Sequence, residues 1–133
     1  MRSVISQTIK FPAAAEDLFE MYLDASKHEA ITGSPVIIGK EPGAKFQAFK
    51  GVLSGIILVV VSPSLIVQSW RSTQFKSTDP DSTLILNFKP DGDSGQIDVV
   101  HLDVPEHDYK GVTEGWEKFY WTPWREYLTQ IPK

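Results

Sequence analysis

The segment from His101 to Leu128 constrains the fold most, because it places three of the chain's four tryptophans on one predicted helix. Each aromatic side chain buries about 150 to 250 Å², so this helix carries too much apolar surface to stand alone. At 3.6 residues per turn the side chains form two adjacent stripes. They are Trp116, Tyr120, Pro123 and Tyr127, then Trp121, Trp124 and Leu128. A broad apolar surface must therefore lie beneath the helix.

Pro123 interrupts this helical pattern. Its ring opposes the carbonyl of Phe119, and its missing N–H removes one hydrogen bond of the helix. The sequence predicts a kink near Thr122.

Charge and composition exclude several classes of protein. The 133 residues are typical of one domain, 1–133. The chain has 17 acidic and 13 basic residues, a net charge of -4, and no Lys/Arg cluster that would favour nucleic acid. With zero cysteines it offers no disulfide and no thiolate metal site. The N-terminal residues lack the apolar core of a signal peptide, and the longest apolar run, Ile56 to Val61, is too short to insert into a membrane. We expect a cytoplasmic protein.

The first third of the chain predicts a strand and two short helices. Ile5, Ile9 and Phe11 alternate with polar residues, which is typical of a half-buried strand ending at Pro12. Residues 13–24 carry an apolar face at helical spacing, and a second helix, Ser26 to Ile31, is expected to stop at Gly33.

The middle of the chain predicts five or six strands separated by Gly, Pro and Asp turns. Leu84, Leu86 and Phe88 alternate with Thr83, Ile85, Asn87 and Lys89, whereas the run GIILVVV (55–61) is apolar on both faces and predicts a central strand. The inward face of the strand around His101 is ambiguous. Antiparallel strands followed by a long helix indicate an α+β fold, in which a curved antiparallel sheet wraps around the C-terminal helix.

Two stretches resemble a known family. HEAITGSPV (28–36) and GAKFQAFKGVLSGIILVVVSPSLIVQSWRS (43–72) are similar to bacterial members of the activator-of-heat-shock-protein-90-ATPase-like family. Further matches are Val104-Pro105, Gly115-Trp116, Tyr120-Trp121 and Pro123. This family lies in the START-like, birch-pollen-allergen-like helix-grip (SRPBCC) superfamily, so the resemblance implies a helix-grip fold over nearly the whole chain.

The resemblance implies several activities rather than one, because superfamily members bind lipids, cyclise polyketides or contact proteins. The eukaryotic co-chaperones of the family carry a separate N-terminal domain that contacts the chaperone. We expect this chain to begin directly with the helix-grip strand.

The candidate ligand-binding residues lie where the sheet would face the C-terminal helix. Ile66, Gln68 and Trp70 share one face of a predicted strand, which either lines a cavity or fills a solid core; Gln68 either orients a ligand or faces solvent. The full predicted set is Phe46, Ile66, Gln68, Trp70, Leu86, Phe88, Trp116 and Tyr120.

Other polar residues are interpreted as structural. His101, Asp103, Glu106, His107 and Asp108 cluster in the sequence, but nothing makes them converge, so we predict no metal site. If Trp70 faces inward, alternation turns Arg71 outward. Arg71 and Glu41 are the charged residues considered for a cavity mouth, and His28 is assigned to a solvated helix face near the pocket entrance.

Sequence motifs for an enzyme are mostly absent. Ser54 lacks the G-x-S-x-G spacing of a nucleophile elbow, and GDSG (92–95) is typical of a hairpin turn. We therefore predict no catalytic residue and no cofactor.

Three hypotheses follow. The first is a non-catalytic module that binds a small hydrophobic or amphipathic ligand between sheet and helix. The second is a co-chaperone-like domain that stimulates a heat-shock protein 90 type ATPase, and the third is a polyketide cyclase-like cavity enzyme. We expect a monomer or a weak dimer.

Overall fold

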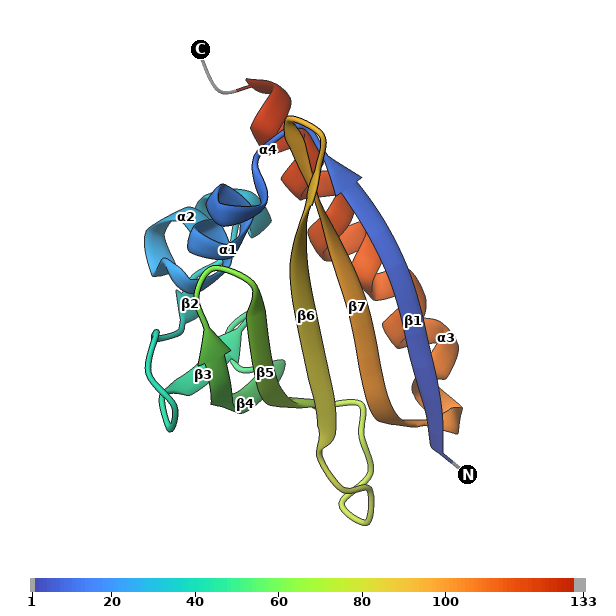
Figure 1. The fold of residues 1–133 in the computed structure, drawn as a ribbon. Helices are drawn as coiled ribbons and strands as arrows, with labels where there is room; N and C mark the ends of the chain where they lie inside the picture. The colour runs from blue at the N-terminus through green and yellow to red at the C-terminus, as the bar shows by residue number, and fades with distance from the viewer. Residues whose placement is uncertain (1, 131–133) are drawn as a thin grey trace.

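The computed structural model describes residues 2–130 and has the predicted α+β architecture (Figure 1). Its antiparallel strands form one curved sheet of seven strands in the order β1-β7-β6-β5-β4-β3-β2. The strands are β1 (Arg2–Phe11), β2 (Val36–Ile37), β3 (Lys45–Ala48), β4 (Leu53–Val61), β5 (Leu65–Ser72), β6 (Ser82–Asp91) and β7 (Ser94–Pro105). This arrangement confirms the predicted sheet.

The helices also follow the predicted order. Two short helices, α1 (Ala15–Leu23) and α2 (Ala25–Thr32), come after β1. A 3₁₀ turn, η1 (Glu106–Asp108), leads into α3 (Tyr109–Trp116), a π-helical turn η2 (Glu117–Trp121) and α4 (Thr122–Gln130). The last three run on without a break as the C-terminal helix, which lies behind β7 and β1 in Figure 1.

Local sequence signals explain how the two short helices begin and end. The side chain of Asp24 caps α2 by accepting a hydrogen bond from the backbone N–H of Lys27 at 3.0 Å. Gly33 ends α2 with a left-handed φ of 78°, a conformation that glycine adopts without steric cost. Leu18 and Phe19 of α1 are buried against the sheet, as their spacing predicted.

A β-bulge settles which face of β7 points inward. Ile97, Val99 and His101 face the core, and Asp103 then adopts a positive φ of 60°. Leu102 and Asp103 together lie opposite the single β1 residue Val4, which shifts the register of the two strands. After the bulge Val104 turns inward and is buried.

The C-terminal helix buries its tryptophans as predicted, but through an irregular turn. Thr122 donates its backbone N–H to the carbonyl of Glu117, five residues earlier, which is the bonding pattern of a π-helix. This irregular turn lies just before Pro123, in the region where the sequence predicted a kink. Trp116, Tyr120, Trp121 and Trp124 are all buried, whereas the side chain of Phe119 is 47% exposed.

The prediction for β4 was correct about its place in the sheet and wrong about its burial. β4 has β3 and β5 as neighbours. Only Leu53 and Ile57 are buried, however, while the outward side chains of Ile56, Leu58, Val59 and Val61 are exposed. Helices cover one face of the sheet, so the apolar run does not become buried on both sides.

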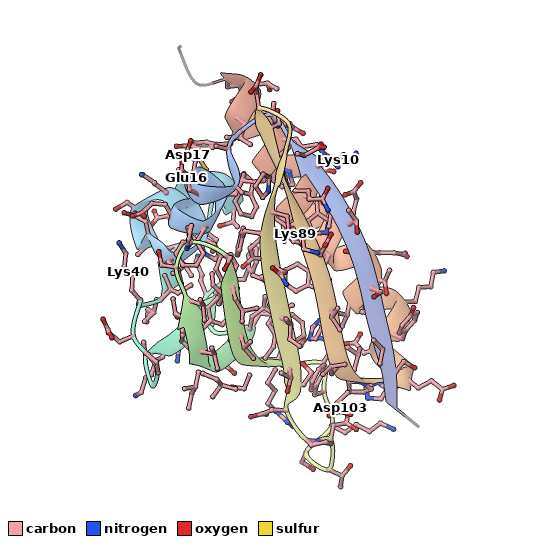
Figure 2. All side chains as sticks on the ribbon, viewed as in Figure 1. Lys10, Glu16, Asp17, Lys40, Lys89 and Asp103 are labelled. Atoms are coloured by element: carbon pink, nitrogen blue, oxygen red, sulfur yellow. The ribbon has the colours of Figure 1, made fainter. Side chains whose placement is uncertain are left out.

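Charged side chains lie mainly on the outer surface, where Figure 2 labels several of them. Lys89 pairs with Asp98 at 2.8 Å, and Lys10 approaches Asp91 at 3.7 Å. Exposed pairs of this kind contribute about 0 to 1 kcal/mol each, so they add little to the stability of the core. Within residues 2–130 no helix is long and apolar enough to cross a membrane.

Candidate functional site

A cavity of about 380 Å³ opens between the sheet and the C-terminal helix. On the sheet side it is lined by Phe49, Val52 and Leu53 around the turn from β3 to β4, and by Trp70 and Ser72 of β5. These residues lie on the β3–β5 side of the sheet, whereas α3 packs beside β1 and β7. The C-terminal helix does not cover the β3–β5 side of the sheet completely, and the cavity lies there.

One face of the C-terminal helix forms the opposite wall. The lining positions recur every three or four residues, so they share a side of the helix. They are Asp108, Gly111, Val112, Gly115, Trp116, Phe119 and Tyr120. Two of the seven are glycines, and the absence of side chains there widens the cavity.

The glycines at these positions are not required by packing. A Cβ added at Gly115 would meet only a ring carbon of Phe119 at 3.8 Å, which is an ordinary contact. At Gly111 a Cβ would lie 2.7 Å from the carboxylate oxygen Oδ1 of Asp108, the end of a movable side chain. A glycine inside a helix costs about 1 kcal/mol relative to alanine. Helix stability is therefore lowered at both positions where the cavity gains volume.

A turn with unusual backbone geometry holds the aromatic edge of the cavity. Phe49, Lys50 and Gly51 have positive φ values of 52°, 57° and 89°. This conformation is unfavourable for the first two residues, because their Cβ atoms crowd the backbone. It places the ring of Phe49 5.5 Å from that of Phe119 and 6.0 Å from that of Tyr120. The turn and the helix thus meet through aromatic contacts beside the cavity.

The predicted ligand-binding residues separate into two groups. Trp70, Trp116 and Tyr120 line the cavity. The other five lie in the packed core outside its lining: Phe46, Ile66, Gln68, Leu86 and Phe88. Their proposed contact with a ligand stays a prediction.

Gln68 points into the core rather than toward solvent, which was the alternative left open by the sequence. Its side chain is fully buried, and its Oε1 accepts a hydrogen bond from the hydroxyl of Tyr22. Its amide nitrogen donates to the carbonyl of Ser69 at 3.3 Å. Gln68 therefore satisfies a buried tyrosine of α1.

His28 is buried, so its assignment to a solvated helix face was wrong. Its Nδ1 donates to the carbonyl of Tyr22 at 2.7 Å, which leaves Nε2 to accept from the hydroxyl of Tyr120 at 2.9 Å. Burial lowers the pKa of His28 to about 4, so the imidazole is neutral at physiological pH. Burial also raises the pKa of Tyr120. The pair fixes Tyr120 in the cavity wall.

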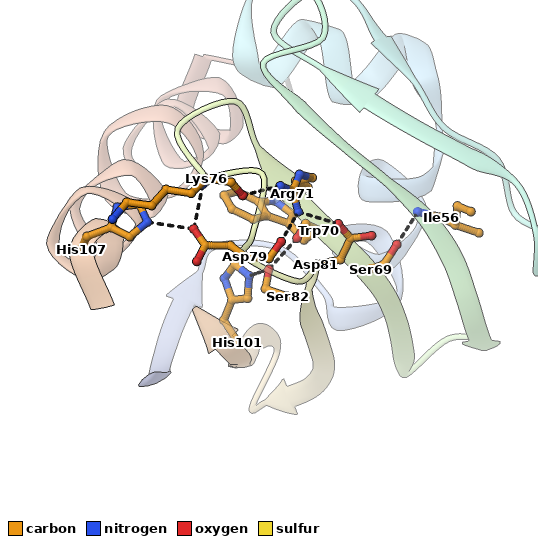
Figure 3. A network of polar contacts seen from close by, with 10 residues as sticks. All are labelled: Ile56, Ser69, Trp70, Arg71, Lys76, Asp79, Asp81, Ser82, His101 and His107. Atoms are coloured by element: carbon orange, nitrogen blue, oxygen red, sulfur yellow. Dashed lines mark hydrogen bonds and ion pairs between the residues drawn. The ribbon is translucent and has the colours of Figure 1, made fainter. Parts of the chain in front are cut away.

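His101 is a second buried histidine that hydrogen-bonds behind the cavity wall. Figure 3 shows its connection through Ser82 to Trp70. Its Nδ1 accepts from the indole N–H of Trp116 at 3.2 Å, so its Nε2 donates to the hydroxyl of Ser82 at 2.8 Å. Ser82 in turn donates to the carbonyl of Trp70 at 2.6 Å. Burial lowers the pKa of His101 to about 3. This neutral chain connects two tryptophans that line the cavity.

Arg71 faces outward, as alternation along β5 predicted. Its guanidinium donates to the carbonyls of Lys76 and Asp79, both at 2.7 Å, and to Asp81 at 3.2 Å. Figure 3 shows these bonds closing the loop between β5 and β6. The other charged candidate for the cavity mouth, Glu41, is exposed in the loop before β3 and lies outside the cavity lining.

The acid and histidine cluster of the sequence is dispersed in the structure. His101 is buried under the sheet, whereas His107 lies at the surface and pairs with Asp79 at 2.9 Å. Between residues 2 and 130 no three His, Asp or Glu side chains are grouped to hold a metal ion.

Sequence reasoning missed most of the residues that line the cavity. Phe49, Gly111, Gly115 and Phe119 line it but were not among the predicted ligand-binding residues. The available signal was the pair Gly111 and Gly115, one helical turn apart in a segment otherwise rich in large side chains.

Comparison with known proteins identifies the family. A model of the family described as Activator of Hsp90 ATPase homolog 1-like protein matches residues 12–129. The chain is 26% identical over 110 residues to the Activator of 90 kDa heat shock protein ATPase homolog of Dictyostelium discoideum, covering 82% of this chain and 28% of that protein. It is 24% identical over 112 residues to homolog 1 of Homo sapiens, covering 83% of this chain and 32% of that protein. The chain thus spans less than a third of either relative.

A solved structure supports the fold. The crystal structure of an HSP90 activator from Plasmodium falciparum superimposes with a TM-score of 0.82 at 20% identity, and the match covers 97% of each chain. The overall fold is thus shared with that protein. The chain belongs to the Activator of Hsp90 ATPase homolog 1-like protein family.

Proposed function

We propose that this chain is one domain that binds a small hydrophobic or amphipathic molecule in the cavity between the sheet and the C-terminal helix. Ligand sites are commonly concave, mostly apolar and lined by aromatic side chains with few polar groups. The cavity has this composition, with Trp70, Trp116 and Tyr120 as the proposed central contacts.

The glycine face of α3 is the observation that carries the proposal. A side chain at Gly115 would reduce the cavity while improving the helix, and no steric contact prevents it. Because protein interiors are generally close-packed, space kept at a loss of helix stability is best explained by an occupant.

The test is to fill the space and measure binding. N-phenyl-1-naphthylamine, a neutral dye that fluoresces in apolar surroundings, serves as the probe. We expect the native protein to bind it and Gly115→Leu to bind at least about tenfold more weakly, because the leucine occupies the cavity. Glu114→Leu is the matched control, since Glu114 is exposed on the same helix and does not line the cavity.

Two results would contradict the proposal. The native protein would show no binding, or Gly115→Leu and Glu114→Leu would bind the probe equally well while both remain folded by circular dichroism. Mass spectrometry of the purified protein under native conditions would add an independent result, because a retained ligand adds mass.

A second candidate function is contact with a chaperone of the heat-shock protein 90 type. It is favoured by the names of the relatives, which are activators of that ATPase. Because the chain spans less than a third of those proteins, activation is a separate proposal from binding. The net charge of -4 would then face a basic surface, and the interaction would weaken as salt rises.

The two functions are distinguished with one isotope-labelled sample. Amide-shift changes around the cavity on adding the dye support the binding module. Line broadening on adding the cognate chaperone, together with faster ATP turnover, supports the second function. Absence of both chaperone effects at low salt would remove it.

A further inference from the structure

Asp108 is the only acidic residue in the cavity lining of the described chain, and it lies at the start of the glycine face. It ends η1, directly before α3. Its Oδ1 lies 2.7 Å from the point that a Cβ on Gly111 would occupy, so the carboxylate rests along the space that the glycines leave open. The carboxylate therefore lies beside the same glycines that widen the cavity.

This carboxylate has no partner among residues 2–130. It occupies the N-cap position of α3, yet its side chain accepts no capping hydrogen bond. The neighbouring His107 pairs with Asp79 instead. Burial raises the pKa of Asp108, with a smaller opposing effect from the charge of His107. A partly buried carboxylate that accepts no capping hydrogen bond keeps water on its exposed side, so its oxygens are free to accept a hydrogen bond from a ligand.

The rest of the lining carries no positive charge. Within the described residues no Lys, Arg or His lines the cavity. The lining otherwise consists of glycines, aliphatic side chains, the uncharged polar side chains of Ser72 and Gln74, and aromatic rings, among them Trp70, Trp116 and Phe119. Aromatic faces attract cations and stack on flat ligands. A ligand carboxylate would meet a like charge at Asp108 and no countercharge.

We propose that the cavity selects a ligand with a flat aromatic body and a positively charged amino group, which forms a charge-assisted hydrogen bond with Asp108. Fatty acids and other carboxylates are rejected. This inference rests on the proposed function of the cavity and specifies its ligand class. It assigns Asp108 as the specificity-determining residue and the aromatic walls as the source of nonspecific affinity.

The experiment uses three small ligands that share one aromatic body: 2-naphthylmethylamine, 2-naphthylmethanol and 2-naphthoic acid. At neutral pH they are positive, neutral and negative. Binding is measured by calorimetry and by quenching of tryptophan fluorescence, since Trp70 and Trp116 line the cavity. We expect the amine to bind about tenfold or more tightly than the alcohol, as a charge-assisted hydrogen bond would provide, and the acid to bind most weakly.

Asp108→Asn tests the assigned residue. The amine should fall to the affinity of the alcohol, and the acid should improve. Glu114→Gln removes the same charge from an exposed site on the same helix outside the lining, so it should leave the order of affinities unchanged.

The outcomes separate this inference from the function on which it rests. Equal affinity for all three ligands, or a preference for the acid, overturns the selection of cations while the binding module stands. A preference for the amine that survives Asp108→Asn overturns the assignment of Asp108. Absence of binding by all three ligands and by N-phenyl-1-naphthylamine overturns both proposals.

Discussion

The space between the sheet and the C-terminal helix has a closed end and an open end, built from the same helix. At the closed end Trp121 and Trp124 pack on Phe11 of β1, with ring centroids 6.2 and 5.0 Å apart. At the open end Gly111 and Gly115 face the cavity. The difference shows that the aromatic side chains seal one half of the fold while the glycines keep the other half accessible.

Hydrogen bonds also hold the aromatic side chains of the C-terminal helix in place. Tyr120 and Trp116, at the boundary, are each held by a buried neutral histidine. Trp121 reaches the side chain of Gln7 at 2.9 Å. The walls of the cavity are therefore fixed from behind by hydrogen bonds. We infer that they keep their shape without a ligand.

The largest expected effect is at the closed end. Trp124 is 1% exposed and packs on Phe11, so Trp124→Ala should lower the free energy of unfolding by about 3 to 5 kcal/mol. Urea denaturation measures this. A loss below about 1 kcal/mol would mean that the closed end is not a packed core. Ligand affinity of the folded fraction should change little, because Trp124 does not line the cavity.

Lowering the pH should reduce the free energy of unfolding, through the two buried histidines at the boundary between the closed and open ends. Burial lowers the pKa of His28 to about 4 and that of His101 to about 3, whereas both are about 6.5 in an unfolded chain. As the pH falls below about 6.5, only the unfolded state gains protons at these sites. The free energy of unfolding should then fall by up to about 1.4 kcal/mol per pH unit for each histidine.

Denaturation curves between about pH 7 and pH 5 measure this slope above the range in which most carboxylates titrate. His101→Gln removes one of the two titrating groups, so its slope should be about half that of the native protein. An unchanged slope in that variant would show that His101 does not titrate as a buried group.

Gln68→Leu should destabilise the folded protein by about 1 to 3 kcal/mol, because it leaves the hydroxyl of Tyr22 buried without an acceptor. The sequence alone left open whether Gln68 orients a ligand or faces solvent. The double variant with Tyr22→Phe should recover much of the loss, since both polar groups are then gone. Additive losses in the double variant would exclude the hydrogen bond as the cause.

The smallest expected change in the free energy of unfolding is at the open end, where it is an increase rather than a decrease. Gly115→Ala should raise the free energy of unfolding by about 0.5 to 1 kcal/mol, because alanine favours the helix and its Cβ meets no close contact. It should also weaken binding of the dye. Destabilisation by alanine would show that glycine is needed for packing and would remove the main support for a functional cavity.

Sequence reasoning succeeded where a local pattern had one solution. The alternation in β1 and β6, the stop of α2 at Gly33 and the burial of the tryptophans all follow from periodicity or backbone chemistry. It failed at His28, which was assigned to a solvated face, and it left the orientation of Gln68 undecided; both are polar residues buried by partners far along the chain. Gln68 bonds to Tyr22, and His28 bonds to Tyr120. No local window contains these pairs.

The sequence by itself determined that a heavily aromatic C-terminal helix must lie on a curved antiparallel sheet, because so much apolar surface has to leave water. Only the tertiary structure decided where that packing stops. The cavity lies where the turn at Phe49, the end of β5 and the glycine face of α3 meet. These three segments are separated along the chain, and none of them alone defines a cavity. Their distance in space depends on the path of the whole sheet, which local periodicity does not encode.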